Sequence, residues 1–200
     1  MKLLTVRFKS MFVVLTCFLF VQSSYAQNWD INIVKNANPD KPNSFVMKTF
    51  SKSVYPVSLA SPVVLLATGY LQNNKQLKLK GWEAVGSLAI NTIVTQGLKY
   101  TIDRQRPYEK YPGIIHPYQI ETDASFPSGH TSTAFATATT LSLEFKKWYV
   151  VVPAYAWAAG VGYSRLYLGE HYASDVIGGA VVGAGSAVLS HWLSKKLFQK

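Results

Sequence analysis

Three short stretches of this 200-residue sequence carry cations and histidines at spacings that suit the binding of an oxyanion. In the first, KYTIDRQRP, Lys99 precedes Arg106 by seven residues, or two helical turns. Both side chains could therefore project from one face of a helix that Pro107 would end. Two cations that converge on one point can bind an anion with several oxygens.

The second stretch, PSGH, precedes a long apolar run. Ser128 at this place predicts a helix N-terminus, where free backbone N–H groups and the helix dipole favour an anion. Gly129 lets the backbone approach a ligand closely, and the hydroxyl of Ser128 can donate a hydrogen bond. His130 follows directly, where it could protonate a bound group.

The third stretch is SRLYLGEHYASD. The guanidinium of Arg165 can bind an oxyanion through two parallel hydrogen bonds. His171 and Asp175 are four residues apart, which makes them neighbours on a helix face. A carboxylate that accepts the Nδ1–H of His171 leaves Nε2 free, so the imidazole can act as a nucleophile or a general base. Together the three stretches can bind phosphate and act on it without a metal.

Five apolar segments must position these residues, and each is long enough for a helix. The composition agrees, with 48% hydrophobic and only 15% charged residues. We expect an all-α fold, a helical bundle of five core helices, or six with the N-terminal apolar segment, embedded in a membrane. A soluble bundle of buried helices is the alternative. The five segments are residues 54–71, 82–100, 131–145, 148–163 and 176–193.

The chain before these segments divides into two parts. Residues 1–26 have a basic start, an apolar stretch and a small-residue cleavage site, which predicts a signal peptide or a first membrane helix. Residues 27–53 are polar and predict an exposed lead-in segment, which could include a short amphipathic helix near residues 45–50. The single cysteine, Cys17, lies in the first part, so a cleaved chain has no thiol for a disulfide, a metal site or catalysis.

The net charge of +10 comes from short lysine clusters and not from a basic stripe, which argues against nucleic acid as a partner. If the five segments cross a membrane, all three clusters after the lead-in fall on one side and the three polar stretches on the other. Because lysines favour the cytoplasmic side, the polar stretches should face the periplasm. The clusters are residues 75–80, 146–147 and 195–200.

Taken together, Lys99-x6-Arg106-Pro107, the PSGH stretch and Ser164-Arg165-x5-His171-x3-Asp175 resemble the three signature motifs of the type 2 phosphatidic acid phosphatase superfamily. They occur in the order and approximate spacing of that family. The resemblance implies that residues 54–200 form a helical phosphatase domain that needs no metal or cofactor.

The resemblance also implies a role for each residue. His171 would attack phosphorus to form a phosphohistidine, and Asp175 would orient His171 and stabilise its charge. His130 would protonate the leaving oxygen and then activate water. The phosphoryl oxygens would be bound by Lys99, Arg106, Ser128, Gly129 and Arg165.

The function to expect is hydrolysis of a phosphate monoester or diphosphate, most simply on a lipid such as phosphatidate, phosphatidylglycerol phosphate, undecaprenyl diphosphate or lipid A. Alternatives are a soluble periplasmic acid phosphatase, a vanadate-dependent haloperoxidase and a non-catalytic anion-binding or transport component. Single residues also have simpler interpretations. Arg165 could pair with a nearby carboxylate such as Glu170, and Glu121 and Asp123 could be solvated loop charges.

Overall fold

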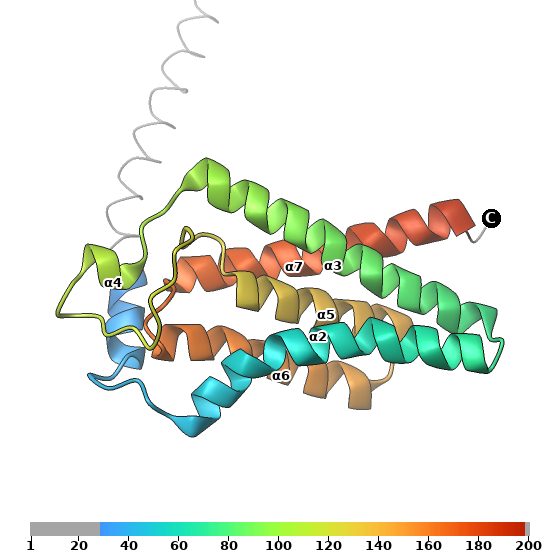
Figure 1. Cartoon of the computed structure of the whole chain (residues 1–200), viewed down its shortest axis with the longest axis horizontal. Coiled ribbons are helices and arrows are strands. Elements are labelled where there is room, and N and C mark those ends of the chain that lie inside the picture. Colours follow the sequence, from blue (N-terminus) through green and yellow to red (C-terminus); the bar gives the residue numbers. More distant parts are fainter. Residues whose placement is uncertain (1–28, 199–200) are drawn as a thin grey trace, which may run out of the picture.

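The computed structural model describes residues 29–198, so the predicted signal peptide or first membrane helix lies outside the described residues. Residues 29–198 form helices and loops without a strand, which confirms the predicted all-α bundle of five core helices (Figure 1). A single-turn helix, α4 (Pro107–Lys110), follows the second long helix. The long helices are α2 (Phe45–Leu71), α3 (Lys75–Ile102), α5 (Gly129–Phe145), α6 (Trp148–Tyr167) and α7 (Ala173–Phe198).

Most of these helices are longer than the apolar segments that predict them. The helix α3 begins at Lys75, where the side chain of Asn74 accepts hydrogen bonds from the backbone N–H groups of Gln76 and Leu77. Polar first turns of this kind escape a search for apolar residues. Four of the five helices have 20 or more residues, the length that crosses the hydrocarbon core of a bilayer, and α5 has 17.

The interior of the bundle is lined by small and hydroxyl side chains. Thr137 donates to Ser58 at 2.8 Å, and Thr140 donates to Ser87 at 3.0 Å, so helices are joined by buried hydrogen bonds. This arrangement is typical of helix contacts in bilayers, where small residues and hydroxyls join helices whose outer faces meet lipid. By length and composition α2 and α7 could each cross a membrane. Large apolar side chains exposed on the outer faces include Leu59, Val63, Ile93, Val152, Val181 and Val188.

Two glycines bring α7 against α5 at the level of the backbone. A Cβ on Gly179 would lie 2.7 Å from the carbonyl oxygen of Ser128, and one on Gly183 would collide with the carbonyl oxygen of Ser132. Small residues four positions apart are typical of such close helix contacts in bilayers. The contact places the second and third turns of α7 beside the first turn of α5.

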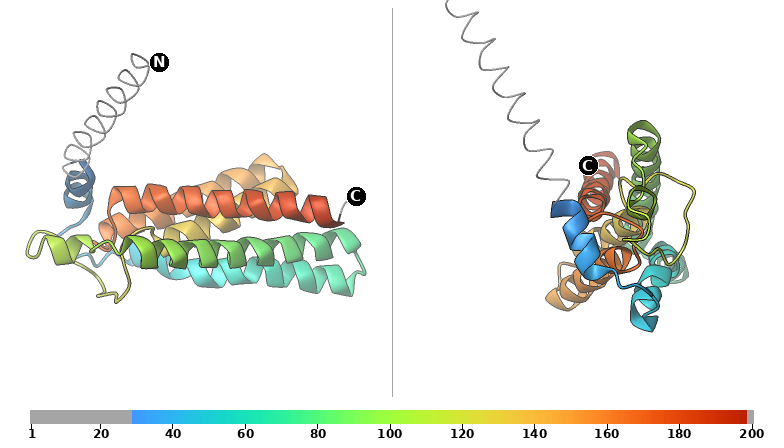
Figure 2. Two further views of the ribbon diagram at one scale, coloured as in Figure 1. Left: turned by 90° about the horizontal axis from the view of Figure 1, so that it is seen from above. Right: turned by 90° about the vertical axis from the view of Figure 1, so that its left-hand side faces the viewer.

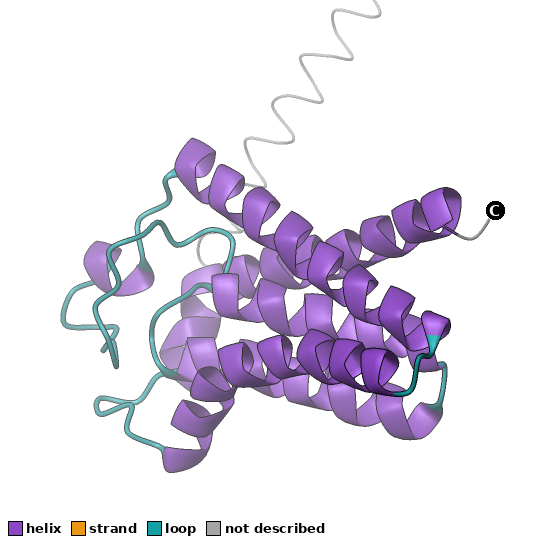
Figure 3. Cartoon of the chain, turned by 45° about the vertical axis from the view of Figure 1, so that its right-hand side comes forward, coloured by secondary structure: helices purple, strands orange, loops and turns teal. Residues whose placement is uncertain are grey.

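The two ends of the bundle differ in kind (Figures 1 and 3). One end holds the α2–α3 and α5–α6 turns and the last turns of α7, and with them the lysines at 75–80, 146–147 and 195–196. The other end holds the long loop of residues 103–128, the loop between α6 and α7, and residues 29–37. All three stretches with candidate chemistry lie at this second end.

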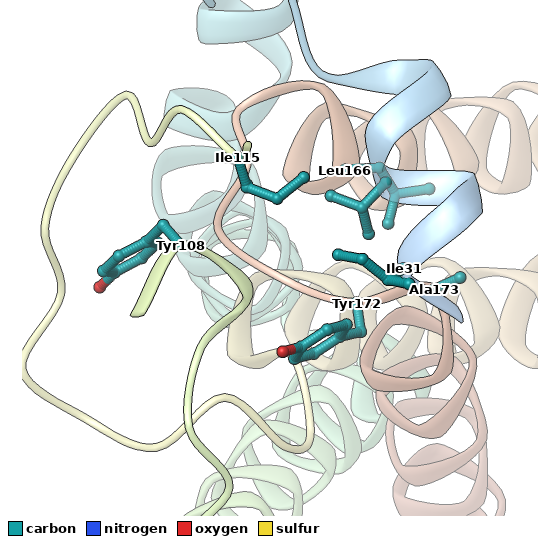
Figure 4. Packing of buried hydrophobic residues seen from close by; sticks show 7 residues of the cluster. Ile31, Tyr108, Ile115, Leu166, Tyr172 and Ala173 are labelled. Carbon is teal, nitrogen blue, oxygen red and sulfur yellow. The ribbon is translucent and has the colours of Figure 1, made fainter. Parts of the chain in front are cut away.

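Residues 29–53 are only partly the exposed lead-in that the sequence predicts, because several of their side chains are buried. Residues 29–37 are helical, and the helix expected near residues 45–50 is the start of α2, which continues into the first apolar segment. Ile31 and Val34 are three residues apart on the short helix and are both buried. The side chains gather in one apolar cluster with Tyr108, Ile115, Leu166, Tyr172 and Ala173 (Figure 4).

Candidate active site

The first stretch does not form the single helix that its spacing suggests. The helix α3 ends before Asp103, whose backbone is left-handed with φ of 43°. Arg106 lies in an extended segment, and Pro107 begins α4 instead of ending α3. The prediction that Lys99 and Arg106 share a helix face is therefore wrong, because the chain turns between them.

Both cations nevertheless meet at Asp123, in the loop that precedes PSGH. The Nζ of Lys99 lies 3.1 Å from Asp123 Oδ2, and the Nη2 of Arg106 lies 2.5 Å from Asp123 Oδ1. Partial burial raises the pKa of Asp123, but Lys99 and Arg106 outweigh it and hold the pKa below its usual value. Asp123 is therefore not the free solvated charge that the sequence suggests. Its carboxylate occupies the point where the two cations converge.

The PSGH stretch forms the predicted helix N-terminus. The Oγ of Ser128 caps α5 and accepts hydrogen bonds from the backbone N–H of Thr131 at 3.5 Å and its hydroxyl at 2.9 Å. The backbone N–H of Ser128 donates to the carbonyl of Asp175 at 3.0 Å. A Cβ on Gly129 would lie 4.0 Å from Cε of Lys99, so the lysine passes directly beside the start of the helix.

His130 lies in the first turn of α5 and is half-buried. The ring of Tyr55, from α2, packs edge-on against its imidazole with the centroids 5.2 Å apart. Arg165 and His171 are close enough for their charges to act on His130. The two imidazoles thus lie at the same end of the bundle, although 41 residues separate them in the sequence.

His171 lies in the loop before α7, not on the helix face that the four-residue spacing predicts. Its Nδ1 is 3.5 Å from Oδ2 of Asp175, which is too long for a formed hydrogen bond, and Nδ1 has no hydrogen-bond partner in residues 29–198. Its Nε2 faces Nη1 of Arg106 at 3.5 Å. Burial, assisted by the charge of Arg106 and opposed by Asp175, lowers the pKa of His171 to about 3. The imidazole is therefore neutral near pH 7.

The carboxylate of Asp175 is fully buried and accepts hydrogen bonds from three groups. They are Nη1 of Arg104 at 2.5 Å, Oγ of Ser125 at 2.5 Å and the backbone N–H of Tyr172 at 2.9 Å. Such partners hold a carboxylate ionised and fix its direction. The sequence interpretation missed Arg104 and Ser125. One feature of the sequence could have indicated a role for Arg104, because this residue lies two positions before Arg106 in the same basic stretch.

Arg165 is almost fully buried at the end of α6. Its Nη1 donates to Ser51 at 2.5 Å, and its Nη2 contacts the carboxylate of Glu170 and lies 3.7 Å from Oε1 of Glu121. The pairing with Glu170, one of the simpler interpretations, is therefore present. The Nε of Arg165 is buried and has no hydrogen-bond partner among the described residues, so this edge of the guanidinium could bind an anion.

Within residues 29–198, one group of carboxylate and imidazole side chains lies close enough to share a metal ion. Nδ1 of His191 is 2.6 Å from Oε1 of Glu83 and 3.3 Å from Oε1 of Glu144. The Nζ of Lys80 also lies 3.7 Å from Oε2 of Glu144, so a cation of the protein already pairs with one of these carboxylates. It lies at the lysine-bearing end, opposite the candidate active site.

Comparison with known proteins places these motifs in context. The family model described as the PAP2 superfamily matches residues 80–199. The chain is 34% identical over 147 residues to the lipid A 1-phosphatase of Porphyromonas gingivalis, which is 72% of this chain and 30% of that protein. It is 30% identical over 131 residues to the undecaprenyl-diphosphatase BcrC of Bacillus subtilis, which is 62% of each chain. The chain thus spans less than two thirds of the length of these relatives.

Two crystal structures share the fold. One is LpxE of Aquifex aeolicus, with a TM-score of 0.65 at 24% identity over 82% of this chain and 95% of that one. The other is the transmembrane PAP2 type phosphatidylglycerolphosphate phosphatase from Bacillus subtilis, with a TM-score of 0.67 at 24% identity over 92% and 96%. At these identities the likeness concerns the arrangement of the helices.

Proposed function

Because the chain belongs to the PAP2 superfamily, we propose that it is a metal-independent phosphatase that hydrolyses a phosphate monoester or diphosphate on a membrane lipid. The observation that carries the proposal is the convergence of Lys99, Arg106 and His171 on the N-terminus of α5. Relatives named as phosphatases of lipid A, undecaprenyl diphosphate and phosphatidylglycerophosphate support a lipid substrate.

The reaction proceeds in two displacements. In the first, the lone pair on Nε2 of His171 attacks phosphorus while the bond from phosphorus to the leaving oxygen breaks, and His130 gives its proton to that oxygen. In the second, His130 takes a proton from water as the water oxygen attacks phosphorus, and the phosphorus–nitrogen bond breaks. The products are the dephosphorylated lipid and inorganic phosphate, and His171 returns to its starting state.

The surrounding groups stabilise the charges of these steps. Asp175 lies on the Nδ1 side of His171, where its carboxylate offsets the positive charge that the imidazole gains on attack. Lys99, Arg106 and Arg165, with Ser128 and the backbone at Gly129, bind the phosphoryl oxygens. Cations and helix-end N–H groups that are already in place need little rearrangement when charge develops in the transition state.

The apolar outer faces of the helices supply the setting for a lipid substrate. A bundle that spans the membrane brings its end loops to the level of the lipid head groups. The lysine-bearing end is then cytoplasmic, and the site faces the periplasm.

The test is a phosphate-release assay of the detergent-solubilised protein on phosphatidate, phosphatidylglycerol phosphate, undecaprenyl diphosphate and lipid A. We expect release from at least one lipid and a phosphoenzyme that can be trapped from labelled substrate. Recovery of the protein from cells without detergent, with activity on soluble esters only, would favour a soluble acid phosphatase. No release from any ester would leave the non-catalytic anion-binding function.

A further inference from the structure

Arg104 lies between Lys99 and Arg106 in the first motif, at a position to which the motif assigns no role, and its guanidinium binds two carboxylates. Its Nη1 donates to Oδ1 of Asp175 at 2.5 Å, and its Nη2 donates to Oδ2 of Asp30 at 2.7 Å. Asp175 and Asp30 are both buried, whereas Arg104 retains some exposure. One guanidinium therefore joins the carboxylate beside His171 to a carboxylate of the helix at residues 29–37.

Neighbouring groups fix this guanidinium from several sides. The Oγ of Ser174 accepts from Nη1 of Arg104 at 2.7 Å and donates to Asp30, and the backbone N–H of Ser174 donates to Oδ1 of Asp30 at 2.8 Å. The ring of Tyr172 lies under the guanidinium, with its centroid 3.9 Å from Cζ. Burial alone would lower the pKa of Arg104, but Asp175 and Asp30 raise it, so its charge is permanent.

The short helix that supplies Asp30 is itself fastened to the site end of the bundle. Ile31 and Val34 are buried in the apolar cluster between the loops and the start of α7 (Figure 4). At the end of the helix, Nδ2 of Asn38 donates to the carbonyls of His116 and Tyr167, both at 2.9 Å. The end-on view shows the helix lying across this end of the bundle (Figure 2).

This helix lies outside residues 80–199, the part of the chain that matches the family model. We infer that residues 29–37 complete the active site. In this inference Asp30 and Arg104 are positioning residues that hold the carboxylate of Asp175 beside the imidazole of His171. The inference rests on the proposed function. Neither residue contacts the phosphate-binding cations in the described hydrogen bonds, so both act through Asp175.

The physical effect is on the rate of the chemical step. Asp30 shares the charge of Arg104 with Asp175, and without Asp30 the guanidinium would cancel more of the charge that Asp175 presents to His171. The imidazolium that forms during attack would then be less stabilised. Substituting a residue that orients a metal-bound histidine through a hydrogen bond typically costs about 10- to 100-fold in activity, and we expect an effect at the lower end of that range here.

The first measurement compares Asp30→Asn, which keeps the shape of the side chain and removes its charge, with Asp40→Asn. Asp40 is a fully exposed carboxylate of the same N-terminal segment. We expect kcat of Asp30→Asn to fall about tenfold, with KM and the Kd for vanadate within about twofold of wild type. Arg104→Gln should behave similarly, and Arg104→Lys should recover part of the rate. Each kcat is calculated per folded molecule, and the folded fraction of each variant is measured by thermal unfolding.

A second measurement does not depend on turnover. The backbone N–H groups of Tyr172 and Ser174 donate to Asp175 and Asp30, so Asp30→Ala should speed hydrogen exchange in the peptide at 172–176 relative to Asp40→Ala. If the wild-type protein hydrolyses no lipid, the proposed function fails, and this exchange still tests the linkage. If the Asp30 variants had the same exchange rates and the same kcat as the Asp40 variants, the inference would be overturned. It would also be overturned if the Asp30 variants bound vanadate more weakly with no change in kcat.

Discussion

The carboxylate of Asp123 lies 3.1 Å from the ammonium of Lys99, in the space that a phosphoryl group must occupy if Lys99 and Arg106 are to bind it. The loop acid thus satisfies the cations while the substrate is absent. In the proposed reaction a substrate phosphate would have to displace it, so Asp123 would compete with any anion that binds there.

Replacing Asp123 with Asn should tighten the binding of vanadate and inorganic phosphate. The side chain is 48% exposed, so the ion pairs that are broken correspond to at most about 1 kcal/mol, and we expect a two- to fivefold lower inhibition constant, about the range of such pairs. The measurement is inhibition at low ionic strength. Asp103→Asn is the matched control, because it removes a loop carboxylate at a left-handed position that Asn tolerates. Weaker binding in Asp123→Asn would mean that Asp123 orients Arg106 for the substrate.

Replacing His171 with Ala should abolish turnover, by about 10³-fold or more, since the proposed nucleophile is removed. The variant should still bind vanadate non-covalently through the three cations. Phosphate release and trapping of the phosphoenzyme measure the effect. His116→Ala, which removes a loop histidine, is the control and should keep the wild-type rate. Turnover by His171→Ala within tenfold of wild type would contradict the assigned role.

The acid limb of kcat/KM should lie below pH 6.5, the ordinary pKa of histidine. Burial lowers the pKa of His171 to about 3, so its lone pair remains available as the pH falls through 6 and 5. The same pKa shift makes the free energy of unfolding depend on pH. The unfolded chain protonates His171 near pH 6.5, so the stability linked to the neutral imidazole is complete above that pH and is lost as the pH falls toward 3. A pH–rate profile tests this, with a substrate whose own ionisation is known. If kcat/KM fell with a pKa of 6.5, and still did so in His130 variants, the low pKa of His171 would be contradicted.

Removing divalent metals should leave the activity intact, because the charge on the phosphoryl group is met by protein cations. Dialysis against EDTA followed by the phosphate-release assay measures this, with a known magnesium-dependent phosphatase as the control. Inhibition that added Mg²⁺ or Zn²⁺ reverses would show that a metal takes part.

The sequence predicts the parts of the fold that depend on local patterns. Ser128 before an apolar run was enough to predict the N-terminus of α5, and hydrophobicity was enough to predict the five long helices. The paths of the loops depend on contacts between distant residues, such as the backbone hydrogen bond from Ser125 to Arg104 and that from Tyr118 to Leu168.

Errors in the predicted site have the same origin. The sequence places Arg106 on the wrong element and gives Asp123 as a solvated charge, because their partners lie 17 residues or more away along the chain. Asp30 had no signal at all. It is a lone acid in a polar segment, and its role follows only from the packing of Ile31 and Val34 that carries it to Arg104.

The absence of a side chain at Gly179 sets the distance between α7 and the start of α5, which carry two parts of the proposed catalytic site. Since no methyl group separates α7 from the carbonyl of Ser128, the amides that would bind the phosphate and the acid that would orient the attacking imidazole lie in direct backbone contact. An alanine at this position would push the two helices apart. The imidazole of His171 would then no longer be aligned with the bound phosphate, although every reacting group would remain in the protein.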